Sequence, residues 1–76
     1  MEQAQSVAAL ALAELTPAQR QVLGGLLAGE LNKQIAHRLG MAEPTVKAHV
    51  TAILRKLGAA NRAQAVAVAR AGGFNA

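Results

Sequence analysis

The chain has 76 residues, a formal net charge of +4, no cysteine and one aromatic residue. A chain of this length forms one domain with a small core, and the lack of cysteine excludes disulfides and thiolate metal sites. The sequence offers no paired carboxylates, no nucleophile–base pair and no glycine-rich phosphate loop. We therefore expect neither an enzyme nor a domain that holds a metal, a cofactor or a small-molecule ligand.

No apolar run in the sequence approaches the ~20 residues that span a bilayer. The apolar stretch 7–13 resembles the core of a signal peptide, but no Lys or Arg precedes it. We therefore expect a cytoplasmic protein without a membrane partner. Residues 1–14 are rich in Ala and Gln and are expected to form a partly helical linker or a frayed tail. The folded domain is expected over residues 15–76.

The first clear helix signal is Thr16, an N-cap residue, followed by Pro17 and by Gln19 in the spacing of a capping box. This helix ends at Gly29. Its interior contains Gly24-Gly25, which close packing of another helix would explain. Its apolar stripe consists of Val22, Leu23, Leu26 and Leu27.

A short helix is predicted over residues 32–39, and a longer one over residues 43–57. Only residues 40–42, which include a glycine, separate the two. This spacing is typical of a helix-turn-helix, expected over residues 32–51, although other helical hairpins share it.

The sequence of the longer helix predicts one aliphatic side and one side of small and basic residues. Its aliphatic residues recur with the period of a buried stripe: Val46, Val50, Ile53, Leu54 and Leu57. The opposite side combines small residues with Lys47 and Arg55, and no acid occurs between positions 44 and 57. Such a side can lie against the base edges of a major groove. Charge supports this interpretation, because residues 47–62 carry four Lys and Arg residues and no acid, which favours a polyanionic partner.

A last helix is predicted over residues 62–71, with Asn61 and Gln64 in the spacing of a second capping box. Ala63, Ala67 and Ala71 share one side of this helix. A row of small residues permits close approach of a second helix, so self-association is one interpretation. The other is that alanine is simply the best helix former.

Five blocks together resemble one family, the LuxR-type helix-turn-helix domain, which is the DNA-binding output domain of NarL/FixJ response regulators and of quorum-sensing regulators. The blocks are LTP at 15–17, NKQIA at 32–36, EPTVKAHV at 43–50, LRKLG at 54–58 and NRAQAV at 61–66. The resemblance runs over residues 15–71 without gaps. One departure is Ala42, which stands where the family usually has a serine N-cap.

The resemblance implies an all-α fold, a compact four-helix bundle of the winged-helix-like superfamily. It also implies sequence-specific binding of double-stranded DNA by a bacterial transcriptional regulator in the nucleoid, as a homodimer, with RNA polymerase as a further candidate partner. Residues at base-reading positions of the family are Pro44, Lys47, Ala48 and Thr51. Residues at phosphate-contact positions are Asn32, Lys33, Thr45, Arg55, Lys56 and Arg62. The dimer interface would contain Ala63, Ala67, Arg70 and Ala71.

Because 76 residues hold no receiver or sensor domain, the resemblance predicts either the excised output domain of a two-component response regulator or a small stand-alone regulator. Two alternatives stay open. One is a sigma-factor-like region that reads a promoter while it contacts RNA polymerase. The other is a helical protein-interaction module with an incidental basic side. Salt separates the latter from DNA binding, because contact with about five phosphates predicts a slope of log K against log[salt] near −4.5.

Overall fold

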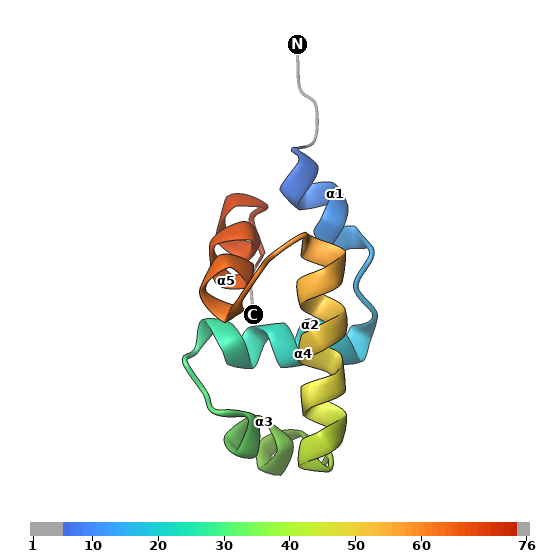
Figure 1. Cartoon of the computed structure of the whole chain (residues 1–76), viewed down its shortest axis with the longest axis vertical. Coiled ribbons are helices and arrows are strands. Elements are labelled where there is room, and N and C mark those ends of the chain that lie inside the picture. Colours follow the sequence, from blue (N-terminus) through green and yellow to red (C-terminus); the bar gives the residue numbers. More distant parts are fainter. Residues whose placement is uncertain (1–5, 75–76) are drawn as a thin grey trace.

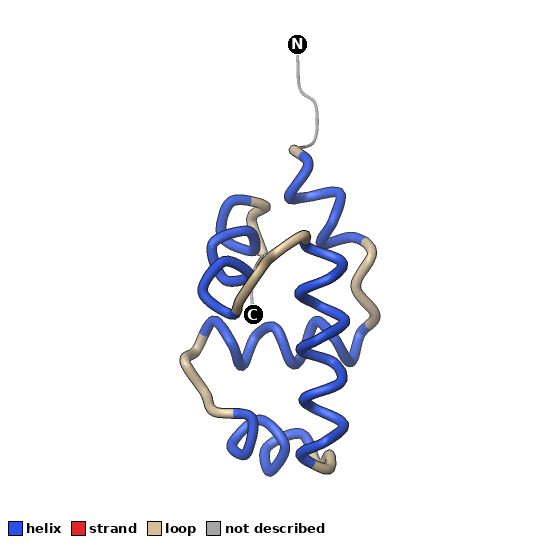
Figure 2. The backbone as a smooth tube through the Cα atoms, viewed as in Figure 1, coloured by secondary structure: helices blue, strands red, loops and turns tan. Residues whose placement is uncertain are grey.

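The computed structural model describes residues 6–74, and these form five helices. The helices are α1 (Val7–Ala13), α2 (Pro17–Leu27), α3 (Asn32–Leu39), α4 (Glu43–Leu57) and α5 (Arg62–Ala71). Figure 1 shows α4 along the length of the molecule, with α2 crossing it, α3 beside its N-terminal part, and α1 and α5 toward the opposite end. Only helices and loops occur in residues 6–74 (Figure 2), so the predicted all-α fold is confirmed. None of these helices is long and apolar enough to cross a membrane.

The core is a single aliphatic cluster to which every helix contributes. Four residues of α4 enter it on one side of the helix: Val46, Val50, Ile53 and Leu57. The remaining buried aliphatic residues are Leu12, Leu15, Val22, Leu23, Leu26, Ile35, Ala36, Ala65 and Ala69. Four of the five residues of the predicted stripe are therefore buried, and the fifth, Leu54, is half-buried against the core.

Helix α1 is an addition to the four predicted helices. Ser6 caps it through its hydroxyl, which accepts a hydrogen bond from the backbone of Ala9 at 3.0 Å. Its Leu12 is only 4% exposed, so the helix is packed rather than frayed. Close approach to the end of α5 depends on Gly72, where a Cβ would lie 3.0 Å from backbone atoms of α1. Residues 1–5 of the expected linker or tail lie outside the described residues.

The start of α2 is the predicted capping box. The Thr16 hydroxyl accepts from the backbone of Gln19, and the Gln19 side chain accepts from the backbone of Thr16, both at 3.1 Å. At α5 the prediction is only half correct. Asn61 accepts from the backbone of Gln64 at 2.9 Å, but the Gln64 side chain accepts from Ala60 instead, at 2.8 Å. The chain bends before Asn61, which brings the Ala60 amide within reach of that amide oxygen.

The turn between α3 and α4 depends on Gly40, whose φ of +66° lies in the left-handed region that favours glycine. Its conformation lets the backbone of Met41 donate to the carbonyl of Ala36 at 2.9 Å, which closes the end of α3. Helix α4 then starts at Glu43, and Ala42 before it supplies no side-chain cap, as its sequence predicts.

We expect Gly25→Ala to lower the free energy of unfolding by about 1–3 kcal/mol, because the new methyl group would overpack the contact between α2 and α3. A Cβ at Gly25 would lie 2.6 Å from Cγ1 of Ile35, a side chain with no exposed surface. Urea unfolding followed by circular dichroism measures the change. The half-buried Gly24 is the matched control. An equal loss in Gly24→Ala would show that the contact with Ile35 is not the cause, because alanine by itself favours the helix over glycine.

Candidate nucleic-acid interface

The outward side of α4 follows from the burial of its aliphatic side. Because Val46 and Ile53 have no exposed surface, the helix cannot turn about its axis without exposing them. All residues predicted to read bases are exposed: Pro44, Lys47, Ala48 and Thr51. Thr45 and Arg55 are exposed as well. This side is small and cationic, with one exposed acid, Glu43, at the first position of the helix.

The N-terminal ends of α3 and α4 border a hollow of about 390 Å³. Asn32 lines it from α3, and Glu43, Pro44 and Lys47 line it from α4. Lys33, in the first turn of α3, is also exposed. The structure therefore brings together residues from both helices of the helix-turn-helix, at the end of the molecule away from α1 and α5 (Figure 1).

Lys56 is predicted to contact phosphate, but it has two partners within the chain. Its ammonium group donates to the carbonyl of Glu14 at 3.0 Å and to Oε1 of Gln19 at 2.9 Å. Lys56 therefore connects the end of α4 to the segment between α1 and α2. Lys56 lies nine positions after Lys47, which at 100° per residue places the two on opposite sides of the helix.

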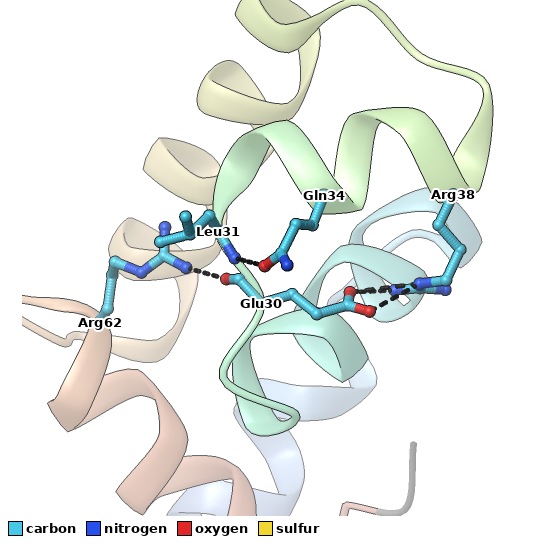
Figure 3. A network of polar contacts seen from close by, with 5 residues as sticks. All are labelled: Glu30, Leu31, Gln34, Arg38 and Arg62. Carbon is cyan, nitrogen blue, oxygen red and sulfur yellow. Dashed lines mark hydrogen bonds and ion pairs between the residues drawn. The ribbon is translucent and has the colours of Figure 1, made fainter.

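Arg62 and Asn32, also predicted phosphate contacts, bind each other. Nη1 of Arg62 donates to Oδ1 of Asn32 at 2.6 Å, and its Nη2 donates to the carbonyl of Glu30 at 2.8 Å. Both residues are half-buried. Figure 3 shows the arginine reaching from α5 to the segment that precedes α3.

Glu30 and Leu31, which connect α2 to α3, are held from several sides (Figure 3). The Glu30 carboxylate accepts from Nη2 and Nε of Arg38, at 2.7 and 3.1 Å, and these hydrogen bonds hold the pKa of Glu30 below its ordinary value. Any stability that this ion pair adds is present at neutral pH and is lost as the pH falls through that lowered pKa. The backbone of Leu31 donates to Oε1 of Gln34 at 2.7 Å. These contacts fix the start of α3, and the hydrogen bonds of Arg62 connect it to α5.

The cations of the chain thus fall into two groups. Four are engaged within it: Arg20, Arg38, Lys56 and Arg62. Arg20 donates to the carbonyl of Leu12 at 3.1 Å and lies over the Phe74 ring. In residues 6–74 the other four have no hydrogen-bond or ion-pair partner: Lys33, Lys47, Arg55 and Arg70. Three of these belong to the helix-turn-helix, so its exposed side concentrates the uncompensated charge.

Sequence reasoning did not identify the supporting role of Arg62 or the cap that Gln34 supplies to α3. The Arg62–Asn32 contact joins residues thirty positions apart, so no local sequence pattern predicts it. Gln34 lies three residues after Leu31, the spacing of a capping box, but leucine has no side-chain acceptor to complete one.

Helix α3, the three-residue connection and α4 form a helix-turn-helix, a motif by which proteins dock a helix in DNA. Residues 13–69 match the family model described as "Bacterial regulatory proteins, luxR family". The chain belongs to this family, and the predicted LuxR-type resemblance is confirmed. It is a DNA-binding domain of transcriptional regulators.

Several curated transcriptional regulators are similar to the chain. The glycerol metabolism activator of Pseudomonas putida is 58% identical over 55 residues, which cover 72% of this chain and 25% of the relative. The DNA-binding transcriptional activator DevR/DosR of Mycobacterium tuberculosis is 48% identical over 58 residues, or 76% of this chain and 27% of the relative. MalT of Vibrio cholerae is 46% identical over 55 residues, 72% of this chain and 6% of the relative. The chain thus spans about a quarter or less of these relatives. No solved structure matches it significantly.

We expect Arg62→Met to lower the free energy of unfolding by about 2 kcal/mol, because both of its hydrogen bonds are lost and their acceptors stay partly buried. Urea unfolding measures the change. Arg70→Met, in the same helix, removes an exposed cation without a hydrogen-bond partner in the described residues and should change stability by less than ~0.5 kcal/mol. Equal effects of the two substitutions would reject a structural role for Arg62.

Proposed function

We propose that this domain binds double-stranded DNA with the exposed side of α4 in the major groove. The observation that carries the proposal is the division of α4 into a buried aliphatic side and an exposed side of small and cationic residues. Small residues such as Ala48 allow the helix to approach the bases closely, and Lys47 can donate to guanine O6 and N7. Pro44 stands at the N-terminal entrance of the helix. The luxR family match favours this function over a sigma-factor-like region or a protein-interaction module.

We propose Lys33, Thr45 and Arg55 as the phosphate contacts of the domain. All three are exposed, and the two cations have no intramolecular partner in residues 6–74. Asn32, Lys56 and Arg62 are proposed instead to hold α3 and α4 in place, since their polar atoms are already bonded within the chain. With Lys33 and Arg55 as the two cations proposed to contact phosphate, the expected slope of log K against log[salt] becomes about −1.8 per domain.

We propose further that two domains pair on DNA through α5. Ala63, Ala67, Arg70 and Ala71 are exposed on one side of this helix, while Ala65 and Ala69 are buried on the other. An exposed side of small residues lets a second helix approach closely. The relative named as a DNA-binding transcriptional activator supports a role as the DNA-binding part of a transcriptional regulator, acting in the cytoplasm where bacterial DNA lies. Whether it serves a response regulator or a stand-alone regulator stays a prediction.

Selection of bound duplexes from a random pool tests the proposed function directly, because it yields a target sequence and the half-site spacing. We then expect Lys47→Ala to weaken binding to the selected duplex by about 1–3 kcal/mol and to relax discrimination at one base pair. Binding to random duplexes should weaken far less. Fluorescence anisotropy at fixed salt measures both affinities.

Arg55→Ala is the matched control, because it removes a proposed phosphate contact on the same helix. It should weaken binding to the selected duplex and to random duplexes alike. It should also make the slope of log K against log[salt] shallower by about 0.9. If Lys47→Ala behaved in the same way as Arg55→Ala, the base-reading role of Lys47 would be wrong.

Ala67→Glu should abolish cooperative binding to a duplex with two half-sites, because a carboxylate would be placed between the paired helices. Its affinity for a single half-site should stay within about twofold, since the hydrogen bond from α5 to α3 is made by Arg62, more than one helical turn before Ala67. Titrations of one-site and two-site duplexes separate these effects. Unchanged cooperativity would exclude this side of α5 as the pairing surface.

A further inference from the structure

Thr51 occupies the middle of the exposed side of α4, one helical turn after Lys47. It is exposed, and its neighbours on this side are the small Ala48 and Ala52 and, one turn away in each direction, the longer Lys47 and Arg55. Its hydroxyl donates a hydrogen bond to the backbone carbonyl of Lys47 at 3.1 Å. This contact decides what the residue can offer to a partner.

A threonine hydroxyl carries one proton and two acceptor lone pairs. In Thr51 the proton is committed to the Lys47 carbonyl, within the same helix. This is one of the two side-chain conformations that threonine adopts in helices, and the β-branch makes it stiff. Toward the outside, Thr51 therefore presents an oxygen that accepts hydrogen bonds and a methyl group, but no donor.

The base edges of the major groove differ in their donors. Adenine presents an amine at N6 and cytosine an amine at N4, whereas guanine presents only the acceptors N7 and O6, and thymine presents the O4 acceptor and a methyl group. An acceptor without a donor matches the exocyclic amines and repels the guanine edge. On the basis of the DNA binding proposed above, we infer that Thr51 is a specificity-determining residue that selects an adenine or cytosine amine and disfavours guanine.

Lys47 has the opposite polarity, because an ammonium group donates and cannot accept. The two residues lie about 6 Å apart along the helix axis, one turn of four residues. The helix thus carries a donor and an acceptor side by side on its exposed side. We expect the target to place a base with acceptors opposite Lys47 and a base with an amine opposite Thr51.

Removal of single amines from the selected duplex tests this inference. Each adenine is replaced in turn by purine, which lacks the N6 amine, and each cytosine by 2-pyrimidinone, which lacks the N4 amine. Each guanine is replaced by 7-deazaguanine, which lacks the N7 acceptor. Affinity is measured for the unmodified domain and for Thr51→Val, which keeps the shape and the methyl group but has no acceptor. At one adenine or cytosine, the unmodified domain should lose roughly three- to tenfold in affinity, and Thr51→Val should lose nothing further.

Comparison of the unmodified domain with Thr51→Val on the same duplex cancels any effect that the modified base has on the DNA itself. Thr51→Ser retains the hydroxyl and should keep the loss at the same base. Coupling of Thr51 to a guanine N7, or equal losses in Thr51→Val and the unmodified domain at every base, would overturn the inference and leave the proposed function intact. If the unmodified domain prefers no duplex over random DNA, the proposed function fails first and the inference with it.

Discussion

Burial of the aliphatic side of α4 is the constraint on which the rest of the structure depends. Val46 and Ile53 have no exposed surface, and full burial of such a side chain contributes about 1.5–3 kcal/mol. A shift of this helix by one residue would turn its stripe by 100° and bring Lys47 toward the core, where an unpaired charge is very costly. The orientation of the exposed side is therefore a consequence of core packing. The side chains proposed to contact DNA need no intramolecular contacts of their own to face outward.

Some of the positively charged side chains of the domain hold its helices together, and others are available to contact DNA. Lys56 ties the end of α4 to the segment before α2, and Arg62 ties the start of α5 to the segment before α3. Both bind backbone carbonyls, so their role is to hold helices together. The cations left without partners in residues 6–74 lie mainly on α3 and α4. A count of basic residues in the stretch 47–62 therefore overstates the number that can neutralise phosphates.

Helix starts in the helix-turn-helix illustrate how the chain replaces missing caps. Leu31 and Ala42 precede α3 and α4, and neither side chain can accept a hydrogen bond. At α3 the side-chain amide oxygen of Gln34 accepts a hydrogen bond from the backbone N–H of Leu31. At α4 the carbonyl of Ala42 accepts from Thr45 and Val46, at 3.0 and 3.1 Å, and Pro44 has no N–H to satisfy. Both helices thus begin where the family pattern predicts, by means of different groups.

The sequence by itself determined those features that depend on neighbours a few positions apart. The capping box at Thr16, the glycine turn at Gly40 and the period of the α4 stripe act over three to eight residues, and the corresponding helix bounds were predicted correctly. The short connection between two predicted helices indicated the helix-turn-helix, and the family blocks added its candidate contact residues. The second capping box was half wrong because a small bend redirected Gln64 to Ala60.

Tertiary structure alone decided the packing of α1 and the roles of Lys56 and Arg62. These depend on residues brought together from distant positions, such as Lys56 and Glu14, which are 42 residues apart. The hydrogen bond that Thr51 donates joins residues only four positions apart. The sequence still did not predict it, because it depends on the side-chain rotamer of Thr51. Local signals set where helices begin and end, whereas the choice among partners for each polar group is made only when the helices have packed.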